Sequence, residues 1–233
     1  MKAFLLAAGL GTRLRPLTDT IPKCLVEIAG KPLLHWWIKL FERHGITEVL
    51  INLHHLPEKV EEYLRSYKGE IQFRIVHEKE LLGSAGTVSE NKQFVMGEEN
   101  FLIAYADNLT NYNLSQMNSF HLSHRLPFSM ALFETDIPKQ KGIAYLNNDQ
   151  TVIEFVEKPD NPKTNLANAG IYICNSEIID LIPPKLPCDI GYDLLPLLVG
   201  NMKGWKTNGF LMDIGTIVHL EKAQKLWKDI NEV

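Results

Sequence analysis

Residues 2–18 read KAFLLAAGLGTRLRPLT, an apolar run that ends in a turn rich in glycine and arginine. The run is continuous rather than alternating, which predicts a strand at Lys2–Ala8 that is buried on both faces. Gly9 and Gly11 would let backbone N–H groups approach phosphate oxygens closely, and Arg13 would add positive charge beside them. The stretch therefore predicts an anion-binding turn at the carboxyl end of a buried strand.

Two familiar phosphate-binding turns fit this stretch less well. A dinucleotide-binding fingerprint needs a small residue where Leu14 stands, and Pro16 discourages a helix that runs straight on. A Walker-type loop is excluded, because no Gly-Lys-Ser/Thr follows the glycines at the required spacing. The turn is of another kind.

The first half of the chain alternates short apolar runs with helical patterns. This predicts an α/β fold with a Rossmann-like, mostly parallel sheet flanked by helices. We expect strands at Lys2–Ala8, Glu48–Leu53, Gln72–Val76 and Asn100–Ala106, and helices at Pro32–His44, Pro57–Tyr67 and about Ser84–Val95. Ligands of such sheets gather at the carboxyl ends of the strands, so Gly9–Arg15 and Asp107 should share one cleft.

The second half has a different pattern, with strands that follow one another directly. We expect strands at Phe128–Glu134, Ile143–Leu146, Val152–Val156, Ala169–Cys174 and Trp205–Met212, and helices at about 176–182, 192–199 and 216–230. Asn147-Asn148-Asp149 is typical of a hairpin turn. Because no flexible linker or repeat divides the chain, we expect a single domain over 1–233, with a nucleotide-binding half at about 1–110 and a substrate-binding half at about 111–233.

Composition excludes several classes of protein. With 233 residues and a formal net charge of −4, the chain does not resemble a binder of nucleic acid that neutralises phosphates over a basic face. No apolar run approaches the roughly 20 residues that span a bilayer, so no membrane partner is expected. The three cysteines, Cys24, Cys174 and Cys188, are odd in number, far apart in sequence and form no C-x-x-C motif. This favours a reduced, cytoplasmic protein.

Beyond the first turn, a second and a third cluster follow at short intervals. Pro22-Lys23 and then Gly30-Lys31-Pro32-Leu33 come after GLGTRLRPLT. Together these strings resemble the signature of the sugar-phosphate nucleotidylyltransferases, and weaker matches recur to about residue 216. The resemblance is closest to members that transfer a guanylyl group to mannose-1-phosphate. It implies a nucleotide-diphospho-sugar transferase fold, here without the C-terminal β-helix that many relatives carry.

The resemblance implies a triphosphate site in which Arg13 and Lys23 stabilise charge during transfer. It places the nucleotide against residues of the first strand, the glycine turn and later loops: Leu6, Ala8, Gly9, Gly11, Thr12, Arg13, Lys23, Glu78, Gly83, Ser84 and Asp107. Taken without the neighbouring motif, Lys23 would read as a solvated surface lysine.

A magnesium site is implied at two aspartates from opposite ends of the chain. Asp107 follows an apolar strand, and Asp213 lies in a late strand-to-helix turn, Leu211–Thr216. Mg²⁺ commonly takes one or two carboxylates, with waters and phosphates at its other positions. Each aspartate, like Thr216, could instead cap a helix. The family usually has Gly before the first aspartate, and this chain has Ala106, whose methyl group could crowd the site.

For the sugar-1-phosphate, the resemblance points to two further motifs, FVEKP at 155–159 and NAGIY at 168–172. Glu157 would accept hydrogen bonds from sugar hydroxyls, and Lys158 would hold the phosphate. The rest of the pocket would be formed by Gly142, Asn168 and Gly170. Alone, Glu157-Lys158 would read as an exposed charge pair.

The base should be read by the loop from Glu78 to Gly83. A carboxylate at Glu78 could accept from both the N1–H and the amino group of guanine, whereas uracil or thymine offers one donor at that edge. This favours GTP, although Glu78 could also be a solvated charge. The sugar stays open between mannose and a manno-configured heptose.

The sequence thus predicts a magnesium-dependent nucleotidyltransferase that condenses a nucleoside triphosphate with a sugar-1-phosphate and releases pyrophosphate. Three alternatives stay open: a cytidylyltransferase acting on a phosphocholine-like acceptor, a non-catalytic regulatory homologue, and a nicotinamide oxidoreductase. A homodimer is left open as well. The adjacent His54-His55 could suggest metal ligands, but no other ligand accompanies them at metal spacing, so a structural or peripheral role is expected. The segment Asp189–Asp193 could position the sugar or form part of an interface.

Overall fold

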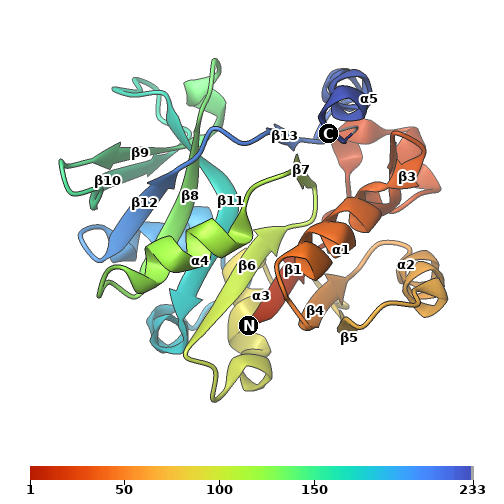
Figure 1. Ribbon diagram of the computed structural model, residues 1–233, viewed down its shortest axis with the longest axis horizontal. Helices are drawn as coiled ribbons and strands as arrows, with labels where there is room; N and C mark the ends of the chain where they lie inside the picture. The colour runs from red at the N-terminus through yellow and green to blue at the C-terminus, as the bar shows by residue number, and fades with distance from the viewer. Residues whose placement is uncertain (232–233) are drawn as a thin grey trace. The chain divides into compact units, whose positions relative to one another are not determined.

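Strand β4 (Glu48–Leu53) shows why this part of the chain forms a covered parallel sheet. Its residues Val49–Leu53 are all buried, which requires packing on both faces. In the computed structural model, which describes residues 1–231, β4 pairs in parallel with β5 (Gln72–His77), from Glu48 opposite Gln72 to Leu53 opposite His77. The connection between them is α2 (Pro57–Ser66), which has its proline in the first turn and packs on β5 (Figure 1).

The chain forms two compact units, each made of several segments. Unit 1 comprises Met1–Phe4, Leu82–Ala104 and Asn113–Asn208. Unit 2 comprises Leu5–Leu81, Tyr105–Tyr112 and the residues from Gly209 on. Strand β1 (Lys2–Leu6) begins in unit 1 and ends in unit 2. The strands are hydrogen-bonded in the order β10-β9-β11-β6-β1-β4-β5, and β8 pairs with β11 and β12 beside this path.

Unit 2 also contains α1 (Leu33–Arg43), which presents buried residues at helical spacing, among them Leu34, Trp37, Ile38 and Phe41. Gly45 follows the helix with φ +67°, a left-handed conformation that suits glycine after a helix end. The Trp37 indole N–H donates to the backbone oxygen of Asn108 over 2.8 Å and ties α1 to β7 (Asn108–Thr110).

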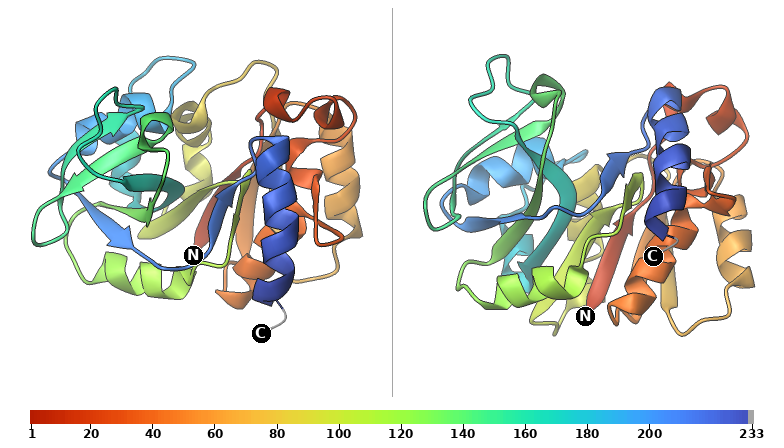
Figure 2. Two further views of the ribbon diagram at one scale, coloured as in Figure 1. Left: turned by 90° about the horizontal axis from the view of Figure 1, so that it is seen from above. Right: turned by 45° about the horizontal axis from the view of Figure 1, so that its top comes forward.

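Two short antiparallel ribbons complete unit 2. One joins β2 (Glu27–Ile28) to β3 (Lys31–Pro32), and the other joins β7 to β13 (Leu211–Asp213). The C-terminal helix α5 (Ile217–Asn231) lies against the β2–β3 ribbon (Figure 2). These elements share a core of apolar side chains that includes Leu14, Val26, Ile28, Leu33, Leu109, Ile214, Leu220, Ala223 and Trp227.

Unit 1 is built from antiparallel pairs. Strand β11 (Leu166–Asn175) pairs with β6 (Asn100–Tyr105), β8 (Phe128–Glu134) and β9 (Gly142–Leu146), and β9 pairs with β10 (Val152–Glu157). Strand β12 (Met202–Lys206) adds to β8 in parallel. Helix α3 (Ser84–Glu90) precedes β6, and α4 (Leu114–Leu122) packs on β8, β11 and β12.

The expected α/β class, with a mostly parallel sheet flanked by helices, is confirmed, and the sheet is mixed because antiparallel pairs are added in unit 1. The turn at Asn147–Asp149 is confirmed too, because the Asn147 carboxamide oxygen accepts from the backbone N–H of Thr151 over 2.8 Å. Three expectations were wrong in detail. The strand expected at Trp205–Met212 is two strands, β12 and β13, that belong to different units. The helices expected at about 176–182 and 192–199 are irregular turns, a 3₁₀ segment at Ser176–Leu181 and a π turn at Ile190–Leu194 followed by a 3₁₀ segment at Leu195–Leu198.

Candidate active site

The β7–β13 ribbon brings together the two aspartates that lie farthest apart in sequence. In its register Asp213 faces Asn108, and the backbone N–H of Ile214 donates to the backbone oxygen of Asp107 over 2.8 Å. Both carboxylates therefore emerge at one end of the ribbon. Neither is a helix cap: Thr216 fills that role for α5, because its hydroxyl accepts from the His219 N–H over 3.2 Å.

Lys23 places its ammonium group between these carboxylates. It begins a 3₁₀ turn (Lys23–Leu25), and its Nζ lies 2.5 Å from Asp107 Oδ2 and 3.9 Å from Asp213 Oδ1. The Lys23 side chain is 11% exposed, against 38% for Asp107 and 23% for Asp213. Lys23 is therefore no solvated surface lysine. The three charges form one cluster that is open to solvent on the carboxylate side.

Arg13 lies close to the same cluster because Gly215, which has no side chain, leaves room for its guanidinium group. At Gly215, which follows Ile214, an added methyl group would lie 2.9 Å from Arg13 Nη2 and 2.8 Å from Asp213 Oδ1. Both groups thus occupy the space that a side chain at 215 would need. Two cations and two carboxylates of unit 2 consequently meet within a few ångströms, as expected from the sequence.

The glycine turn is held in shape by side chains from within unit 2. Gly11 has φ +63°, and an added methyl group would lie 2.9 Å from Thr18 Cγ2. The Thr18 hydroxyl donates to the backbone oxygen of Gly11 over 2.8 Å. Thr12 and Arg13, in the 3₁₀ turn Thr12–Leu14, are exposed. The hydrogen bond from Thr18 to Gly11 thus holds the turn, and the charged side chain of Arg13 faces solvent.

His54 and His55, expected to have a structural or peripheral role, both contact the backbone near other candidate residues. His55 Nε2 lies 2.8 Å from the backbone oxygen of Thr18, and His54 Nδ1 lies 2.7 Å from that of Glu78. A carbonyl oxygen only accepts, so each of these ring nitrogens carries the proton. The pair ties Thr18, beside the glycine turn, and Glu78, after β5, to the end of β4. A histidine pair directly after an apolar strand was the signal available in the sequence.

Glu78, expected to read the base, is 7% exposed and directly follows β5. It is not a solvated charge. Its Oε1 accepts from Asn52 Nδ2 over 2.7 Å, and Asn52 Oδ1 accepts from the backbone N–H of Ala7 over 2.8 Å. Two residues near the start of the chain were also expected to contact nucleotide. Leu6 is the last residue of β1, and its backbone oxygen accepts from the N–H of Ala106 over 3.0 Å. Ala8 lies beyond the end of β1 and is buried.

Ala106 stands where the family usually has glycine. It is 1% exposed, so its methyl group is enclosed within the protein rather than presented at the surface of the site. The neighbouring thiol of Cys24 is also buried, and burial raises its pKa to about 12, which keeps it protonated and inert. Cys174 and Cys188 are buried and unpaired as well, in keeping with the expected absence of a disulfide framework.

A second group of expected residues gathers in unit 1 around Glu157. Glu157 ends β10 opposite Gly142 of β9, where an added methyl group would overlap the Glu157 carboxylate. At Gly191 a methyl group would lie 2.9 Å from Glu157 Oε2. Burial raises the pKa of Glu157, the nearby Asp189 adds to this, and Lys158 and Lys141 oppose it. The two glycines make room for a partly desolvated carboxylate.

Lys158 follows Glu157 in a left-handed conformation, φ +50°, that side chains rarely adopt. Its backbone N–H donates to the Lys141 oxygen over 3.0 Å, and its ammonium lies 5.6 Å from the centre of the Tyr192 ring. Glu157 and Lys158 thus both approach the segment at Gly191 and Tyr192. Lys158 is exposed and available to an anion.

Asn168 and Gly170 lie at an irregularity of β11. The Asn168 carboxamide oxygen accepts from the Gly170 N–H over 2.9 Å, its nitrogen donates to the Tyr172 hydroxyl over 2.7 Å, and Gly170 has φ +67°. The register of β11 against β8 shifts between Asn168 and Tyr172. Both residues therefore shape the backbone of the strand, and their contact with a sugar stays a prediction.

Gly83 and Ser84 are pinned within unit 1 to the segment that follows Cys188. A methyl group at Gly83 would overlap the Cys188 backbone, and the Ser84 hydroxyl donates to Asp189 Oδ2 over 2.9 Å while accepting from the Ile190 N–H over 2.7 Å. Asp189 also accepts from the Gly191 N–H over 2.8 Å. Asp189 is therefore an organising residue of unit 1, and a direct role of Ser84 at the nucleotide stays a prediction.

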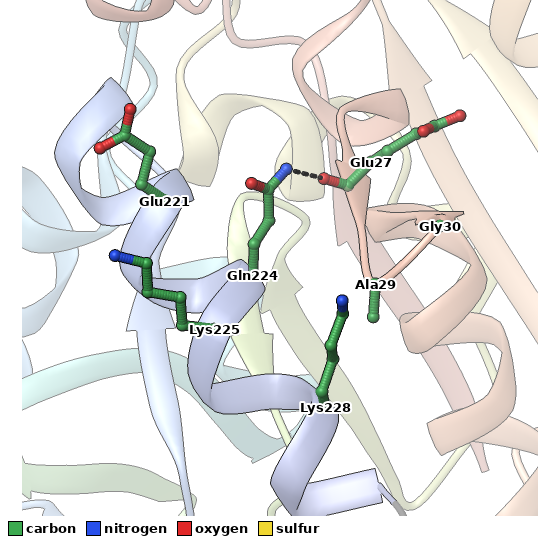
Figure 3. A pocket seen from close by; sticks show the side chains of 7 residues that line it. All are labelled: Glu27, Ala29, Gly30, Glu221, Gln224, Lys225 and Lys228. Carbon is green, nitrogen blue, oxygen red and sulfur yellow. Dashed lines mark hydrogen bonds between the residues drawn. The ribbon is translucent and has the colours of Figure 1, made fainter.

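A separate hollow of about 550 Å³ lies between α5 and the β2–β3 ribbon. Gln224 bridges it by donating to the backbone oxygen of Glu27 over 3.2 Å, and Lys228 extends from α5 toward the ribbon, whereas the Lys225 side chain points away from the ribbon (Figure 3). No residue that we expect to bind substrate is among those that line it. We assign it no part in the chemistry.

Comparison with known proteins shows the family of the chain. The family model described as nucleotidyl transferase matches residues 2–229. The chain belongs to this family. No helix within residues 1–231 of this nucleotidyl transferase family member is long and apolar enough to cross a membrane.

The chain is 31% identical over 222 residues to a mannose-1-phosphate guanyltransferase of Schizosaccharomyces pombe, an alignment that covers 92% of this chain and 61% of the relative. It is 33% identical, with the same coverage, to mannose-1-phosphate guanylyltransferase 1 of Arabidopsis thaliana. This family member thus spans about three fifths of the length of these relatives. A Bacillus anthracis structure, provisionally named glucose-1-phosphate thymidylyltransferase and solved with a sucrose, superposes with a TM-score of 0.87 at 25% identity, covering 99% of this chain and 96% of that one.

Proposed function

We propose that this chain transfers a nucleotidyl group from a nucleoside triphosphate to a sugar-1-phosphate. The observation that carries the proposal is Lys23 Nζ held between Asp107 and Asp213, with Arg13 against the same carboxylate. Such a cluster suits a reaction between two polyanions, where catalysis consists mostly of positioning and charge neutralisation. Family membership sets the nicotinamide oxidoreductase alternative aside.

In the proposed reaction, an oxygen of the sugar phosphate attacks the α-phosphorus, a new P–O bond forms, and the bond from the α-phosphorus to the bridging oxygen breaks. The electron pair of that bond leaves with pyrophosphate. The nucleophile is already an anion, so no general base is required. Arg13 and the backbone of the glycine turn would hold the triphosphate, and Lys23 would offset negative charge that builds up at the α-phosphate.

The two aspartates fit a magnesium ion. They already enclose one cationic atom, Lys23 Nζ, and both are partly exposed, which leaves room for water and phosphate oxygens. Within residues 1–231 no cluster of three or more His, Cys, Asp or Glu side chains offers a metal site made of protein ligands alone, a pattern that suits Mg²⁺ better than zinc. When bound, Mg²⁺ would supply positive charge to the phosphate oxygens.

GTP is the proposed nucleotide, because the buried Glu78 carboxylate offers acceptors for the two adjacent donors of guanine. The relatives named as guanylyl-transferring enzymes support this choice. For the acceptor we propose mannose-1-phosphate or a manno-configured heptose-1-phosphate, bound by Glu157, Lys158, Gly142, Asn168 and Gly170. Nucleotide binding is assigned to about 1–110 and sugar-phosphate binding to about 111–233. A cytoplasmic homodimer remains a prediction.

Pyrophosphate release tests the proposal. Purified protein is mixed with Mg²⁺ and each of the four nucleoside triphosphates, in combination with mannose-, heptose- and glucose-1-phosphate and with phosphocholine. We expect the fastest release with GTP and a manno-configured sugar phosphate. Release confined to CTP with phosphocholine would favour the cytidylyltransferase alternative. Absence of release with every pair would favour a regulatory homologue and contradict catalysis.

A further inference from the structure

Asn52 is a polar side chain in the otherwise apolar centre of β4. It is 3% exposed, and its neighbours Ile51 and Leu53 are fully or almost fully buried. Its carboxamide makes two contacts with different elements of unit 2: the oxygen accepts from the N–H of Ala7, and the nitrogen donates to Glu78 Oε1. Burying an amide in a strand core is costly unless both ends are satisfied, as they are here.

The orientation of this amide is fixed by chemistry. A backbone N–H can only donate, so the carboxamide oxygen must face Ala7, and the nitrogen must then face Glu78. The backbone of Glu78 is held as well, since its N–H donates to the Leu53 oxygen over 2.8 Å and its oxygen accepts from His54. The Glu78 carboxylate is thereby aimed by a partner whose own direction is set by the start of the glycine turn.

We propose that Asn52 is a positioning residue that sets base selectivity by holding the Glu78 carboxylate in the orientation that accepts two adjacent N–H donors of a purine. The inference rests on the proposed role of Glu78 in reading guanine. It adds that the base-reading carboxylate and the phosphate-binding turn are coupled through one side chain, because Asn52 contacts Ala7 two residues before Gly9.

The isosteric variant Asn52→Asp tests the inference. The carboxylate that it introduces keeps an acceptor for Ala7 but turns its second oxygen toward Glu78, where two carboxylates repel. We expect kcat/KM for GTP to fall about 10- to 100-fold, as for the loss of an aligned hydrogen-bonded pair, while kcat/KM for UTP falls much less. Lowering the pH should restore part of the GTP activity of the variant, because one proton shared by the two carboxyls recreates the hydrogen bond. A merely structural role would lower and restore the activities with GTP and UTP together, so the ratio of the two is the deciding readout.

Asn175→Asp is the matched control, because Asn175 is also an amide whose oxygen accepts from a buried partner, Nε2 of His121, in unit 1. It should leave the ratio of GTP to UTP activity unchanged. If Asn52→Asp does not fold, Asn52→Ala takes its place, because it removes the contact with Glu78 without adding a charge. Glu78 then keeps both oxygens but loses the partner that orients it, so the GTP to UTP ratio should still fall.

The outcomes separate the two proposals. If Glu78→Gln loses the preference for GTP but the Asn52 variants keep it, the role of Asn52 is overturned and the guanylyl-transfer proposal stands. If the wild-type protein shows no preference for GTP, the assignment of Glu78 fails and the role of Asn52 falls with it. A reduced GTP to UTP ratio in Asn52→Asp, recovered at lower pH and absent from Asn175→Asp, supports the inference.

Discussion

Lys23 is the residue on which the charge cluster depends. Its ammonium contacts both Asp107 and Asp213, so its removal leaves two carboxylates of unit 2 facing the same space without the cation that lies between them. Their repulsion would then be relieved by any cation that binds between them. This consequence can be measured without following the reaction.

Lys23→Met should melt at a lower temperature than the wild type in metal-free buffer and should be stabilised more by millimolar Mg²⁺. A ligand at about 100 times its dissociation constant adds about 2.7 kcal/mol to stability. For a chain of this size each kcal/mol corresponds to about 2–4 °C in Tm. Thermal melting with and without Mg²⁺ measures the difference, and Lys23→Met with Asp107→Asn is the control that should lose it. Equal Mg²⁺ responses of Lys23→Met and the wild type would argue against an ion at these carboxylates.

The effect of pH on stability through Glu157 should be opposite to that of most carboxylates, whose pKa is lowered in the folded protein. Burial raises its pKa, so the folded protein binds the proton more tightly than the unfolded chain does. Its contribution to stability is fully present below the unfolded pKa of about 4.3 and is lost as the pH rises through the folded pKa. At neutral pH the ionised Glu157 therefore destabilises the fold relative to a neutral residue of the same shape.

Glu157→Gln should accordingly have a higher Tm than the wild type at pH 7, and the two curves should converge as the pH falls toward 4. The same variant should have a weaker affinity for the sugar phosphate, because an amide accepts fewer hydrogen bonds from hydroxyls. Melting curves over this pH range check the first part. A Tm difference that does not depend on pH would show that the pKa of Glu157 is not raised by burial.

At the scale of elements, the two glycines of the glycine turn, Gly9 and Gly11, meet different requirements: one leaves open space and the other adopts a left-handed backbone conformation. A methyl group at Gly11 would be strained by φ +63° and would press on Thr18, whereas at Gly9 it meets nothing within 4 Å. Gly11→Ala should therefore cost about 1–2 kcal/mol of stability. Gly9→Ala should leave Tm nearly unchanged but raise KM for the nucleotide, because the methyl group fills space that a phosphate would approach. Unchanged KM in Gly9→Ala would remove Gly9 from the phosphate site.

The sequence predicted long, regular elements well, because their patterns are local. Strands β4 and β8 begin and end where the apolar runs do, and α1 and α5 lie within one or two residues of their predicted bounds. The expected strand at Trp205–Met212 was wrong, because Trp205 and Met212 belong to separate strands on either side of an irregular segment. Helix α4 was not predicted, since only Leu114, Met117 and His121 of it are buried and its apolar pattern is weak.

The motifs named the candidate site residues, and the family resemblance implied that Asp107 and Asp213 meet, but the residue pattern alone did not predict which side chains lie together. Nothing local in the sequence places Asn52 against Glu78, because that contact follows from β4 and β5 being neighbours in the sheet. The polar residue inside an apolar strand was the available sign. In the same way, the meeting of Asp107 and Asp213 depends on a three-residue ribbon, β7–β13, too short to be recognised from residue pattern.

At the scale of the whole molecule, the net charge of −4 conceals a local arrangement of cations suited to phosphate. Arg13 and Lys23 belong to unit 2 together with both aspartates and Glu78, while Glu157 and Lys158 belong to unit 1. The candidate residues of each unit thus include both a carboxylate, which can accept hydrogen bonds from hydroxyl or N–H groups, and a cation, which can bind phosphate. The central claim concerns the unit 2 cluster.

A double-mutant cycle on turnover tests that claim most directly. Asp107→Asn, Asp213→Asn and the double variant are compared with the wild type in pyrophosphate release from GTP and the preferred sugar phosphate. If both carboxylates serve one ion, each single change should lower kcat by about 10²–10³, and the double variant should be little worse than the more damaged single one. Losses that multiply, or near-normal turnover in Asp213→Asn with its fold intact, would contradict the account.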